Sequence, residues 1–267
     1  KIKLRVMKYS RAIIMFSVIL ASACTSQKKL SYLNNLPVEG GYFPMEVPEY
    51  KIQKRDVLYI AIKAMTPDGM ITDFLSASRG NLSANIMQSE SGQFIFGYDV
   101  NKEGDIILPV IGNLHVEGLS LEDTRKLISE KSAAVFNNAV VECKLLSFKF
   151  TVLGEVRMPG SYMNYNNYLT VFEAIGRAGG VGDYGKRNNV TILRPSDRGT
   201  KSYRLNLQDK NILSAEGYFI LPNDVIIVEP EKNKIFNMNL PMISFILTSV
   251  TSSITMMILI LNFTKGN

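Results

Sequence analysis

Residues 240–263 read LPMISFILTSVTSSITMMILILNF, and no charged side chain occurs between Lys234 and Lys265. A helix of this length rises about 36 Å, which is more than the roughly 30 Å of the hydrocarbon core of a bilayer. The stretch therefore predicts a C-terminal transmembrane helix, which we place over residues 235–264.

A stripe of polar side chains interrupts the apolar surface of this predicted helix. At about 100° per residue, one narrow face collects Ser244, Thr248, Thr251, Thr255 and Asn262. The stripe indicates either the lining of a water-filled pore or a contact with other helices, because hydroxyl and small residues commonly join packed membrane helices. Both interpretations require an oligomer. A plain tail anchor, which requires none, is the third interpretation.

A second membrane signal lies near the other end of the sequence. Lys8 and Arg11 precede an apolar run over residues 12–23, which ends in small residues directly before Cys24. This pattern is typical of a secretory signal peptide, so we expect residues 1–23 to be removed. Cys24 stands where a bacterial lipobox has its acylated cysteine, although Ala21 takes the place of the usual Leu. An uncleaved signal anchor is the alternative.

Charge and cysteine content exclude several classes of protein. Residues 1–23 hold five of the thirty basic residues and no acidic one, so the remainder is nearly neutral, unlike a nucleic-acid binder. His115 is the single histidine, and Cys143 is the single cysteine left once Cys24 carries lipid. Neither a Cys/His metal cluster nor a Ser–His–Asp triad is expected. We predict no catalytic residue, no metal site, no cofactor and no enzymatic activity.

The middle of the sequence predicts two small units that contain both strands and a helix. Residues 24–49, rich in Asn, Pro and Gly, are interpreted as a lipidated tether. A strand over residues 54–63, a hairpin formed by residues 93–100 and 104–110, and a helix that begins after Ser120 follow. Residues 139–145 and 148–152 alternate as strands, which indicates a small mixed sheet with a helix across one face.

The second unit repeats this order of elements. Thr170 and Glu173 form a capping box, and the short helix that follows ends at Gly179 and Gly180. Strands are expected over residues 189–193, 202–207, 218–221 and 224–229. Residues 224–228 (DVIIV) also echo residues 56–60 (DVLYI), which suggests weak internal similarity.

An ordered set of motifs permits a comparison with a known family. The motifs are DVL at 56–58, GDIILPVIG at 104–112, VEGLS at 116–120, VLGEV at 152–156 with PG at 159–160, EAI at 173–175 with AGG at 178–180, and PNDVI at 222–226. In this order and spacing, residues 50–231 resemble the polysaccharide biosynthesis/export family, the Wza-type outer-membrane auxiliary lipoproteins. The lipobox and the terminal helix also lie where that family has them.

The resemblance implies an α+β fold, with two domains and a helix that follow one another along the chain. A small mixed-sheet polysaccharide export domain over residues 50–147 would precede a soluble-ligand-binding β-grasp (SLBB-like) domain over residues 148–232 and the transmembrane helix. It implies an outer-membrane lipoprotein, anchored by lipid at Cys24, with the bulk of the chain in the periplasm. Members form homo-oligomeric rings whose terminal helices build a barrel for export of capsular polysaccharide or exopolysaccharide.

The resemblance also implies the partners. They are the polysaccharide itself, membrane lipid, and an inner-membrane polysaccharide co-polymerase that is often a tyrosine autokinase; no nucleic acid is implied. One departure is that a barrel stave should be more strongly amphipathic than this helix. A membrane-tethered glycan-binding or adaptor module that forms no pore is therefore the alternative function.

Three tyrosines alternate with asparagines shortly after the second unit begins. Tyr162, Tyr165 and Tyr168 could stack on sugar rings, because aromatic faces suit the apolar surface of a ring, while neighbouring amides bond the hydroxyls. The alternative is a polar loop at a subunit interface. The absence of Trp from the chain argues against a tight sugar site.

Overall fold

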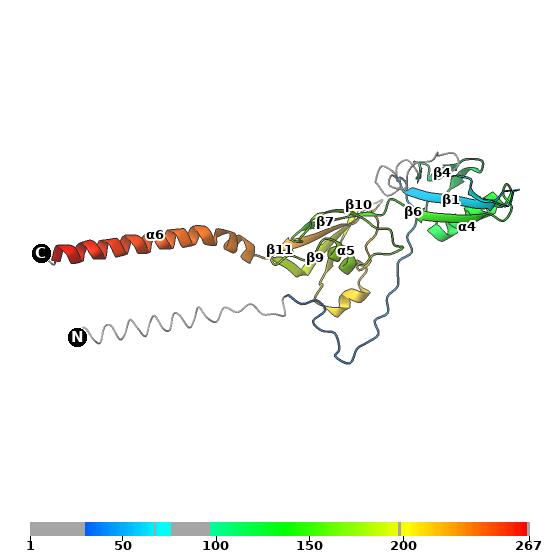
Figure 1. Ribbon diagram of the computed structural model, residues 1–267. Helices are drawn as coiled ribbons and strands as arrows, with labels where there is room; N and C mark the ends of the chain where they lie inside the picture. Colours follow the sequence, from blue (N-terminus) through cyan, green and yellow to red (C-terminus); the bar gives the residue numbers. More distant parts are fainter. Residues whose placement is uncertain (1–29, 67, 76–96, 197–198, 266–267) are drawn as a thin grey trace.

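The computed structural model describes residues 30–66, 68–75, 97–196 and 199–265, which form two domains and one long helix arranged in series (Figure 1). Domain 1 is built around β1 and α4, domain 2 around β9, β11 and α5, and α6 extends from domain 2 (Figure 1). Each domain has its own cluster of buried apolar side chains. The α+β fold predicted from the sequence is confirmed.

Domain 1 is organised by one buried strand, β1 (Val57–Met65). It pairs antiparallel with β6 (Val140–Leu145) and, near its two ends, with β2 (Ile71–Asp73) and β3 (Tyr98–Asp99). Leu58, Ile60 and Ile62 alternate along β1 and are fully buried, as the alternation of a strand requires. Ile128 of α4 (Leu121–Ala133) belongs to the same core.

The predicted hairpin of residues 93–100 and 104–110 is wrong for the residues that the structure describes, which do not include residues 93–96. β4 (Asp105–Leu108) pairs instead with β5 (Gly112–His115), and β3 pairs with β1. The turn before β4 does form, because the Asn101 side chain accepts from the amides of Glu103 and Asp105 at 3.0 and 2.8 Å. The buried strand β1 needs partners for its backbone groups, however, and it takes β3 as one of them.

Domain 2 is a five-stranded mixed sheet in the order β10-β9-β11-β7-β8. The strands are β7 (Lys149–Gly154), β8 (Gly160–Met163), β9 (Gly185–Ser196), β10 (Gly199–Leu205) and β11 (Val225–Pro230). β7 and β11 are parallel, and the other pairs are antiparallel. α5 (Val171–Arg177) and the 3₁₀ helix η2 (Lys210–Ser214) contribute buried side chains to the core beneath this sheet.

The helix predicted in domain 2 is confirmed, but one predicted strand is wrong. The Thr170 hydroxyl accepts from the Glu173 amide at 3.2 Å, and the Glu173 carboxylate accepts from the Thr170 amide at 2.7 Å. The predicted strand over residues 218–221 forms only one isolated bridge, between Phe219 and Thr170. Its apolar side chains are buried in the core, so their pattern reflects packing and not a ladder of strand pairing.

The echo between residues 56–60 and 224–228 corresponds to the same local structure. Arg55 and Asn223, which precede the two aspartates, both have left-handed backbones, with φ of 70° and 66°. Asp56 accepts from the amide of Gln53 at 2.9 Å, and Asp224 accepts from the amide of Leu221 at 2.8 Å. Each carboxylate thus closes a tight turn that leads into a buried strand.

Residues 31–35, which lie in the segment interpreted as a tether, are docked on domain 2. The amides of Leu33 and Asn34 donate to the carbonyls of Leu207 and Gln208 at 3.0 and 2.7 Å. We call residues 31–49 the strap, because the chain passes from this contact over domain 2 to the start of domain 1 (Figure 1). The strap therefore touches domain 2 before the chain enters domain 1.

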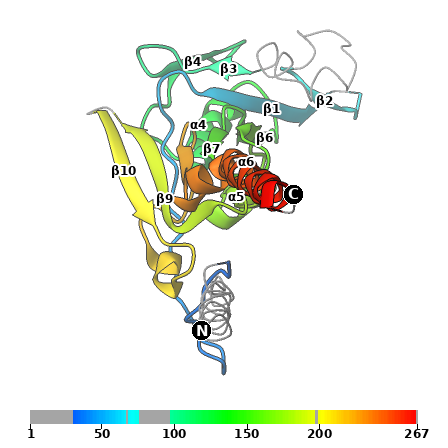
Figure 2. The ribbon, with the colours of Figure 1, turned by 90° about the vertical axis from the view of Figure 1, so that its left-hand side faces the viewer.

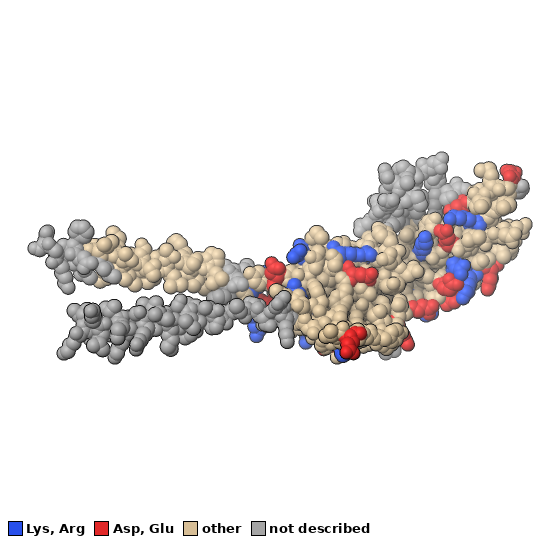
Figure 3. All heavy atoms as spheres, turned by 60° about the horizontal axis from the view of Figure 1, so that its bottom comes forward, with Lys and Arg blue, Asp and Glu red and all other residues tan. Residues whose placement is uncertain are grey.

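The helix α6 (Asn233–Lys265) extends from domain 2, and its side chains from Asn239 to Met257 are exposed. Its segment Asn239–Met257 is long and apolar enough to cross a membrane, and none of it is buried in the molecule. Figure 2, a view close to the axis of α6, shows it projecting away from the domain 2 sheet. Figure 3 shows no acidic or basic side chain on the described length of α6 beyond its root, whereas both signs are interspersed over the domains.

Candidate functional site

The hydroxyl groups of α6 are hydrogen-bonded within the helix. Ser244 donates to the carbonyl of Pro241 at 2.8 Å, Thr248 to Ser244 at 2.7 Å, and Thr255 to Thr251 at 2.8 Å. Thr251 donates to the carbonyls of Leu247 and Thr248. The donors are therefore satisfied, and the oxygens remain as acceptors on an exposed face. Asn262 belongs to α6, but its side chain lies outside the part that the structure describes.

A second pair of hydroxyls lies on another side of α6. Ser249 donates to the carbonyl of Phe245 at 2.9 Å, and Ser253 donates to that of Ser249 at 2.8 Å. These two residues are one turn apart and roughly 150° around the helix from the predicted stripe. A search of the sequence for one continuous polar face does not find this pair.

The root of α6 is joined to domain 2 by an ion pair. Lys234, in the first turn of the helix, contacts the carboxylate of Glu155, which follows β7. The backbone carbonyl of Glu155 also accepts from the amide of Gly182 at 2.9 Å, so this turn is held from both sides. Glu155 thus holds the first turn of α6 at domain 2.

The loop that carries the tyrosines is anchored by a buried amide. Asn164, with 1% of its surface exposed, donates to the carbonyl of Asn166 at 2.8 Å. Its oxygen accepts from Arg177 at 2.9 Å, and the same guanidinium donates to the carbonyl of Met163 at 2.7 Å. Arg177 comes from the last turn of α5, so helix and loop are fixed to each other.

The structure separates the three tyrosines into two groups. The Tyr162 ring stacks on Phe150, with ring centroids 5.6 Å apart, and its hydroxyl donates to the carbonyl of Met158. Tyr165 and Tyr168 are exposed and lie on the loop that faces domain 1; the Tyr168 ring meets Phe219 edge-on at 6.2 Å. Only Tyr165 and Tyr168 therefore share a surface.

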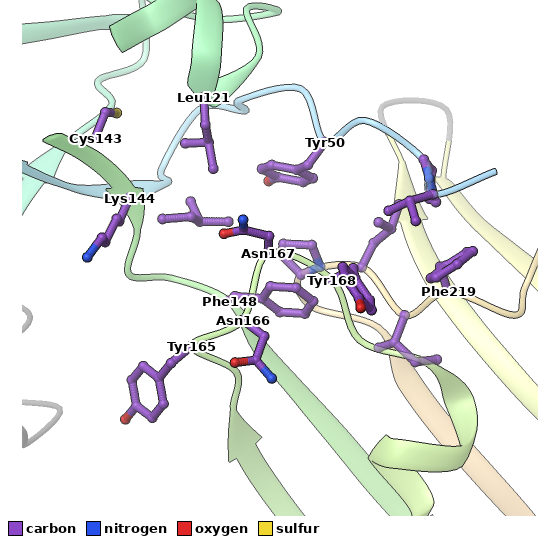
Figure 4. Close-up of a pocket in the computed structure, with 16 residues that line it drawn as sticks. Tyr50, Leu121, Cys143, Lys144, Phe148, Tyr165, Asn166, Asn167, Tyr168 and Phe219 are labelled. Carbon is purple, nitrogen blue, oxygen red and sulfur yellow. The ribbon is translucent and has the colours of Figure 1, made fainter. Parts of the chain in front are cut away.

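That surface borders a pocket between the two domains, which encloses about 140 Å³ (Figure 4). The strap contributes one wall, residues 121 and 143–145 of domain 1 a second wall, and domain 2 the remainder. The lining residues include Tyr50, Leu121, Lys144, Phe148, Asn167 and Tyr168. In Figure 4, Asn167 lies between Tyr50 and Leu121 on one side and Phe148 on the other. We call this cavity the interdomain pocket.

A buried carboxylate lies behind the interdomain pocket. Asp56 accepts from the Tyr50 hydroxyl at 2.8 Å and from the Ser147 hydroxyl at 3.0 Å. Burial raises the pKa of Asp56, and hydrogen bonds from Gln53, Tyr50 and Ser147 offset this only in part. Burial, with a further contribution from Asp56, also raises the pKa of Tyr50. The carboxylate thus links Tyr50, which follows the strap, to the start of β1 and to Ser147 in the connection between the domains.

Cys143, which lines the interdomain pocket, is the free cysteine of the described residues. Burial raises the pKa of its thiol to about 12, so the thiol stays protonated at neutral pH. The lipidation candidate Cys24 and the predicted signal segment lie outside the described residues. No group of three or more His, Cys, Asp or Glu side chains suited to a metal occurs within the described part of the chain.

Comparisons with known proteins agree with this architecture. The family described as polysaccharide biosynthesis/export protein matches residues 44–146, and the SLBB domain family matches residues 148–228. The chain is similar to the EPS I polysaccharide export outer membrane protein EpsA of Ralstonia nicotianae (strain ATCC BAA-1114 / GMI1000), with 30% identity over 151 residues. That match covers 53% of this chain and 38% of the relative.

The protein of the same name from Ralstonia solanacearum is 30% identical over 148 residues, which cover 52% of this chain and 38% of the relative. The chain thus spans well under half the length of the curated relatives it matches. These matches are to transport proteins and not to enzymes, as the sequence predicts. Residues 44–146 thus match the polysaccharide biosynthesis/export family and residues 148–228 the SLBB domain family, and these two consecutive matches support a polysaccharide export family for the chain.

Proposed function

We propose that this protein acts in polysaccharide export at the outer membrane, where several copies associate through α6 to form a channel for capsular polysaccharide or exopolysaccharide. The observation that carries the proposal is the unpartnered helix α6 on an export-family domain pair, long enough to span a bilayer and with none of its apolar span buried in the molecule. An isolated helix of this kind is satisfied only by lipid or by other membrane helices.

The two relatives support the coarser part of this proposal, because each is named as a polysaccharide export outer membrane protein. The channel, the lipid anchor at Cys24, the periplasmic position of domains 1 and 2, and contact with an inner-membrane co-polymerase or tyrosine autokinase are our extension. The hydroxyl stripe of α6 supports an oligomer, because small hydroxyl residues allow a neighbouring membrane helix to approach closely.

One observation favours the alternative of a tethered adaptor that forms no pore. The hydroxyl donors of the stripe are already bonded to carbonyls of α6, so they offer a pore only acceptor oxygens. No charged side chain lies along the described span to line a wide aqueous lumen. Helix packing is an equally good use of such a face.

The experiment that separates the two functions is native mass analysis with particle imaging of the full-length chain in mild detergent. A closed ring with an empty axis would support the channel. A monomer or dimer would support the adaptor. Deleting residues 236–265 should abolish surface polysaccharide in the first case, and a Cys24→Ser chain should no longer incorporate labelled fatty acid if the anchor is as proposed.

A further inference from the structure

The side chains that line the interdomain pocket suit a small ligand, and the proposed role of α6 does not account for them. We propose that the pocket binds a single ring of an acidic saccharide, such as a uronic acid unit, and that the bound ring bridges domains 1 and 2. This inference rests on the proposed function, which makes a glycan the available ligand. The site itself is derived from the residues that line it.

The walls of the interdomain pocket suit the two kinds of surface that a sugar ring presents. Phe148 and Phe219 of domain 2 and Leu121 of domain 1 supply apolar faces, and Tyr50 and Tyr168 add further rings. Carbon-bound hydrogens of a pyranose pack on such faces. Ligand sites generally combine an apolar lining with a few polar groups that fix orientation.

The polar groups of the interdomain pocket are amides without another partner. Asn166 and Asn167 line the pocket and are exposed, so their side-chain amides, which form no hydrogen bond within the described chain, are open to a ligand as well as to water. Asn167 lies at its centre in Figure 4, between Tyr50 and Phe148. An amide offers both a donor and an acceptor, which is what a ring hydroxyl requires. The loop that carries both residues is held in place by the buried Asn164.

The charge of the lining indicates an acidic ligand. Lys144 is the one charged residue among the side chains that line the interdomain pocket, and no Asp or Glu is among them. The nearby buried carboxylate, Asp56, is occupied by the Tyr50 hydroxyl. Lys144 is exposed at the rim and its ammonium points outward in Figure 4, so a change of rotamer would bring this flexible side chain to a ligand carboxylate.

The size of the pocket restricts the ligand to about one ring. Its 140 Å³ is well below the roughly 300–1,000 Å³ of pockets for drug-sized ligands. A chain of sugars would have to leave the pocket toward solvent, so we infer that a terminal or side-branch unit is held. Because the lining comes from the strap and both domains, occupation should also restrict their relative movement.

Ligand-observed saturation-transfer NMR on the full-length chain in detergent micelles tests this inference, with glucuronate and glucose as probes. We expect saturation transfer to glucuronate at millimolar concentration and weaker transfer to glucose. Lys144→Gln should reduce the affinity for glucuronate about tenfold, to the level of glucose. Asn167→Leu should abolish binding of both, since it removes the central amide at nearly constant size.

Matched controls are available on exposed surfaces outside the pocket, namely Lys131→Gln and Asn188→Leu, and both should leave the affinity within about twofold of the wild type. Amide spectra of each variant establish that the domains are folded. Asn167→Ala serves as a second variant that removes the central amide, and it should abolish binding in the same way. Absence of saturation transfer from the folded wild type, or binding that survives Asn167→Leu and Lys144→Gln, would overturn the proposal.

The outcome is distinguishable from failure of the proposed function. If deletion of α6 abolishes surface polysaccharide while glucuronate gives no saturation transfer, the export function stands and the pocket site is refuted. If glucuronate binding depends on Asn167 and Lys144 while deletion of α6 leaves surface polysaccharide normal, the pocket site stands and the channel is refuted.

Discussion

Asp56 and Asp224 occupy equivalent turns, but of the two only Asp224 forms an ion pair among the described residues. Arg194 binds Asp224 through two contacts, with Nε 3.0 Å from Oδ1 and Nη2 2.7 Å from Oδ2. Asp56 forms no ion pair within the described residues and is held by hydroxyls and one amide. The same turn thus carries an ion-paired carboxylate in domain 2 and one without an ion pair in domain 1, although burial raises the pKa of both aspartates.

We expect the buried charge of Asp56 to appear in the pH dependence of the free energy of unfolding of domain 1. Because burial raises the folded-state pKa of Asp56, the native state holds its proton more tightly than the unfolded chain does. The resulting stabilisation is full below the unfolded pKa of about 3.9 and is lost as the pH rises through the folded pKa. Urea unfolding, followed through amide signals of β1 at a series of pH values from about 3.5 upward, measures it.

The matched variant is Asp56→Asn, which cannot titrate. It should be less stable overall by about 1–3 kcal/mol, since three donors then face one carbonyl oxygen. Subtracting its pH profile from that of the wild type should leave a free energy of unfolding that falls with rising pH. A difference that instead rises above a pH of about 4 would mean that the hydrogen bonds outweigh burial at Asp56.

Cys143 gives a second prediction at the level of one residue. With a pKa of about 12 in place of 9.0, its thiolate fraction at a pH of about 8 should be lower by roughly a thousandfold. In a Cys24→Ser chain, which leaves Cys143 as the only cysteine, alkylation by iodoacetamide should be slower than that of the urea-unfolded chain by about this factor. Equal rates in the folded and unfolded chains would contradict the burial of the thiol.

Local chemistry was predictable at this scale, and partners distant in the sequence were not. The Thr170 capping box and the echo of Asp56 in Asp224 follow from neighbouring residues, so the sequence contains them. The ion pair of Lys234 with Glu155 joins residues 79 positions apart, and no spacing rule could find it. The same holds for Ser147 and Asp56, whose contact depends on how the two domains join.

At the scale of elements, α6 shows what a polar stripe in a membrane helix can and cannot do. The stripe hydroxyls donate to carbonyls of their own helix, so they can enter a bilayer without an unsatisfied donor. They can still accept a hydrogen bond, and their small size allows close approach of another helix. The stripe therefore favours association over wide, water-filled contact.

The stripe can be tested by the double substitution Thr248→Leu and Thr255→Leu. Each substitution should weaken the association of two neighbouring helices by about 1 kcal/mol, and in a ring every subunit has two such interfaces. We expect the oligomer extracted in mild detergent to dissociate and surface polysaccharide to fall, while amide spectra of the two domains stay unchanged.

The matched control is Ser249→Leu with Ser253→Leu, which makes a closely similar chemical change on another side of α6. Equal effects from both pairs would assign the result to helix hydrophobicity in general and remove any special role from the stripe. Normal oligomers and normal polysaccharide in the threonine pair would leave the plain tail anchor as the better interpretation.

Strand pairing was the weakest prediction among the elements. β4 and β5 pair around Val110, which has φ of 71° although branched residues seldom adopt it, so the residue at this position did not indicate a tight turn. The Asn101 turn was a strong signal, but the strand before it was needed by β1. Local turn propensity was thus outweighed by the requirement that a buried strand be paired on both edges. The interdomain pocket could not be predicted at all, because three separate segments form it.

For the whole molecule, the strap would set how far the proposed lipid at Cys24 can lie from the two domains. Docking begins at Ser31, and the short segment between Cys24 and Ser31 reaches at most about 25 Å. If residues 31–35 were released, the tether would extend to Tyr50, and its reach would grow to about 90 Å. The docked strap would hold domain 2, which also carries the root of α6, close to the bilayer that anchors the lipid.

The contact that docks residues 31–35 on domain 2 is small and specific. The Asn35 side chain donates to Asp209 at 3.0 Å and accepts from the amide of Lys210 at 2.7 Å. The Tyr32 ring meets Phe172 edge-on at 5.9 Å and lies beneath the guanidinium of Arg187, 5.7 Å away. An exposed peptide segment gains its order from these contacts and from two backbone hydrogen bonds.

Removing the side-chain contacts should release the strap without unfolding domain 2. Asn35→Ala together with Tyr32→Ala should cost about 2–3 kcal/mol of local stability, so the amides of Leu33 and Asn34 should exchange with deuterium about thirtyfold or more faster. Amides of β9, which belong to the core, should keep their exchange rates. The exposed pair Tyr42→Ala with Val38→Ala, in the undocked middle of the strap, is the matched control and should change neither set. If Leu33 and Asn34 exchange fast already in the wild type, the strap is not docked in solution, and the height of domain 2 above the membrane must be set by α6 and its ion pair with Glu155 alone.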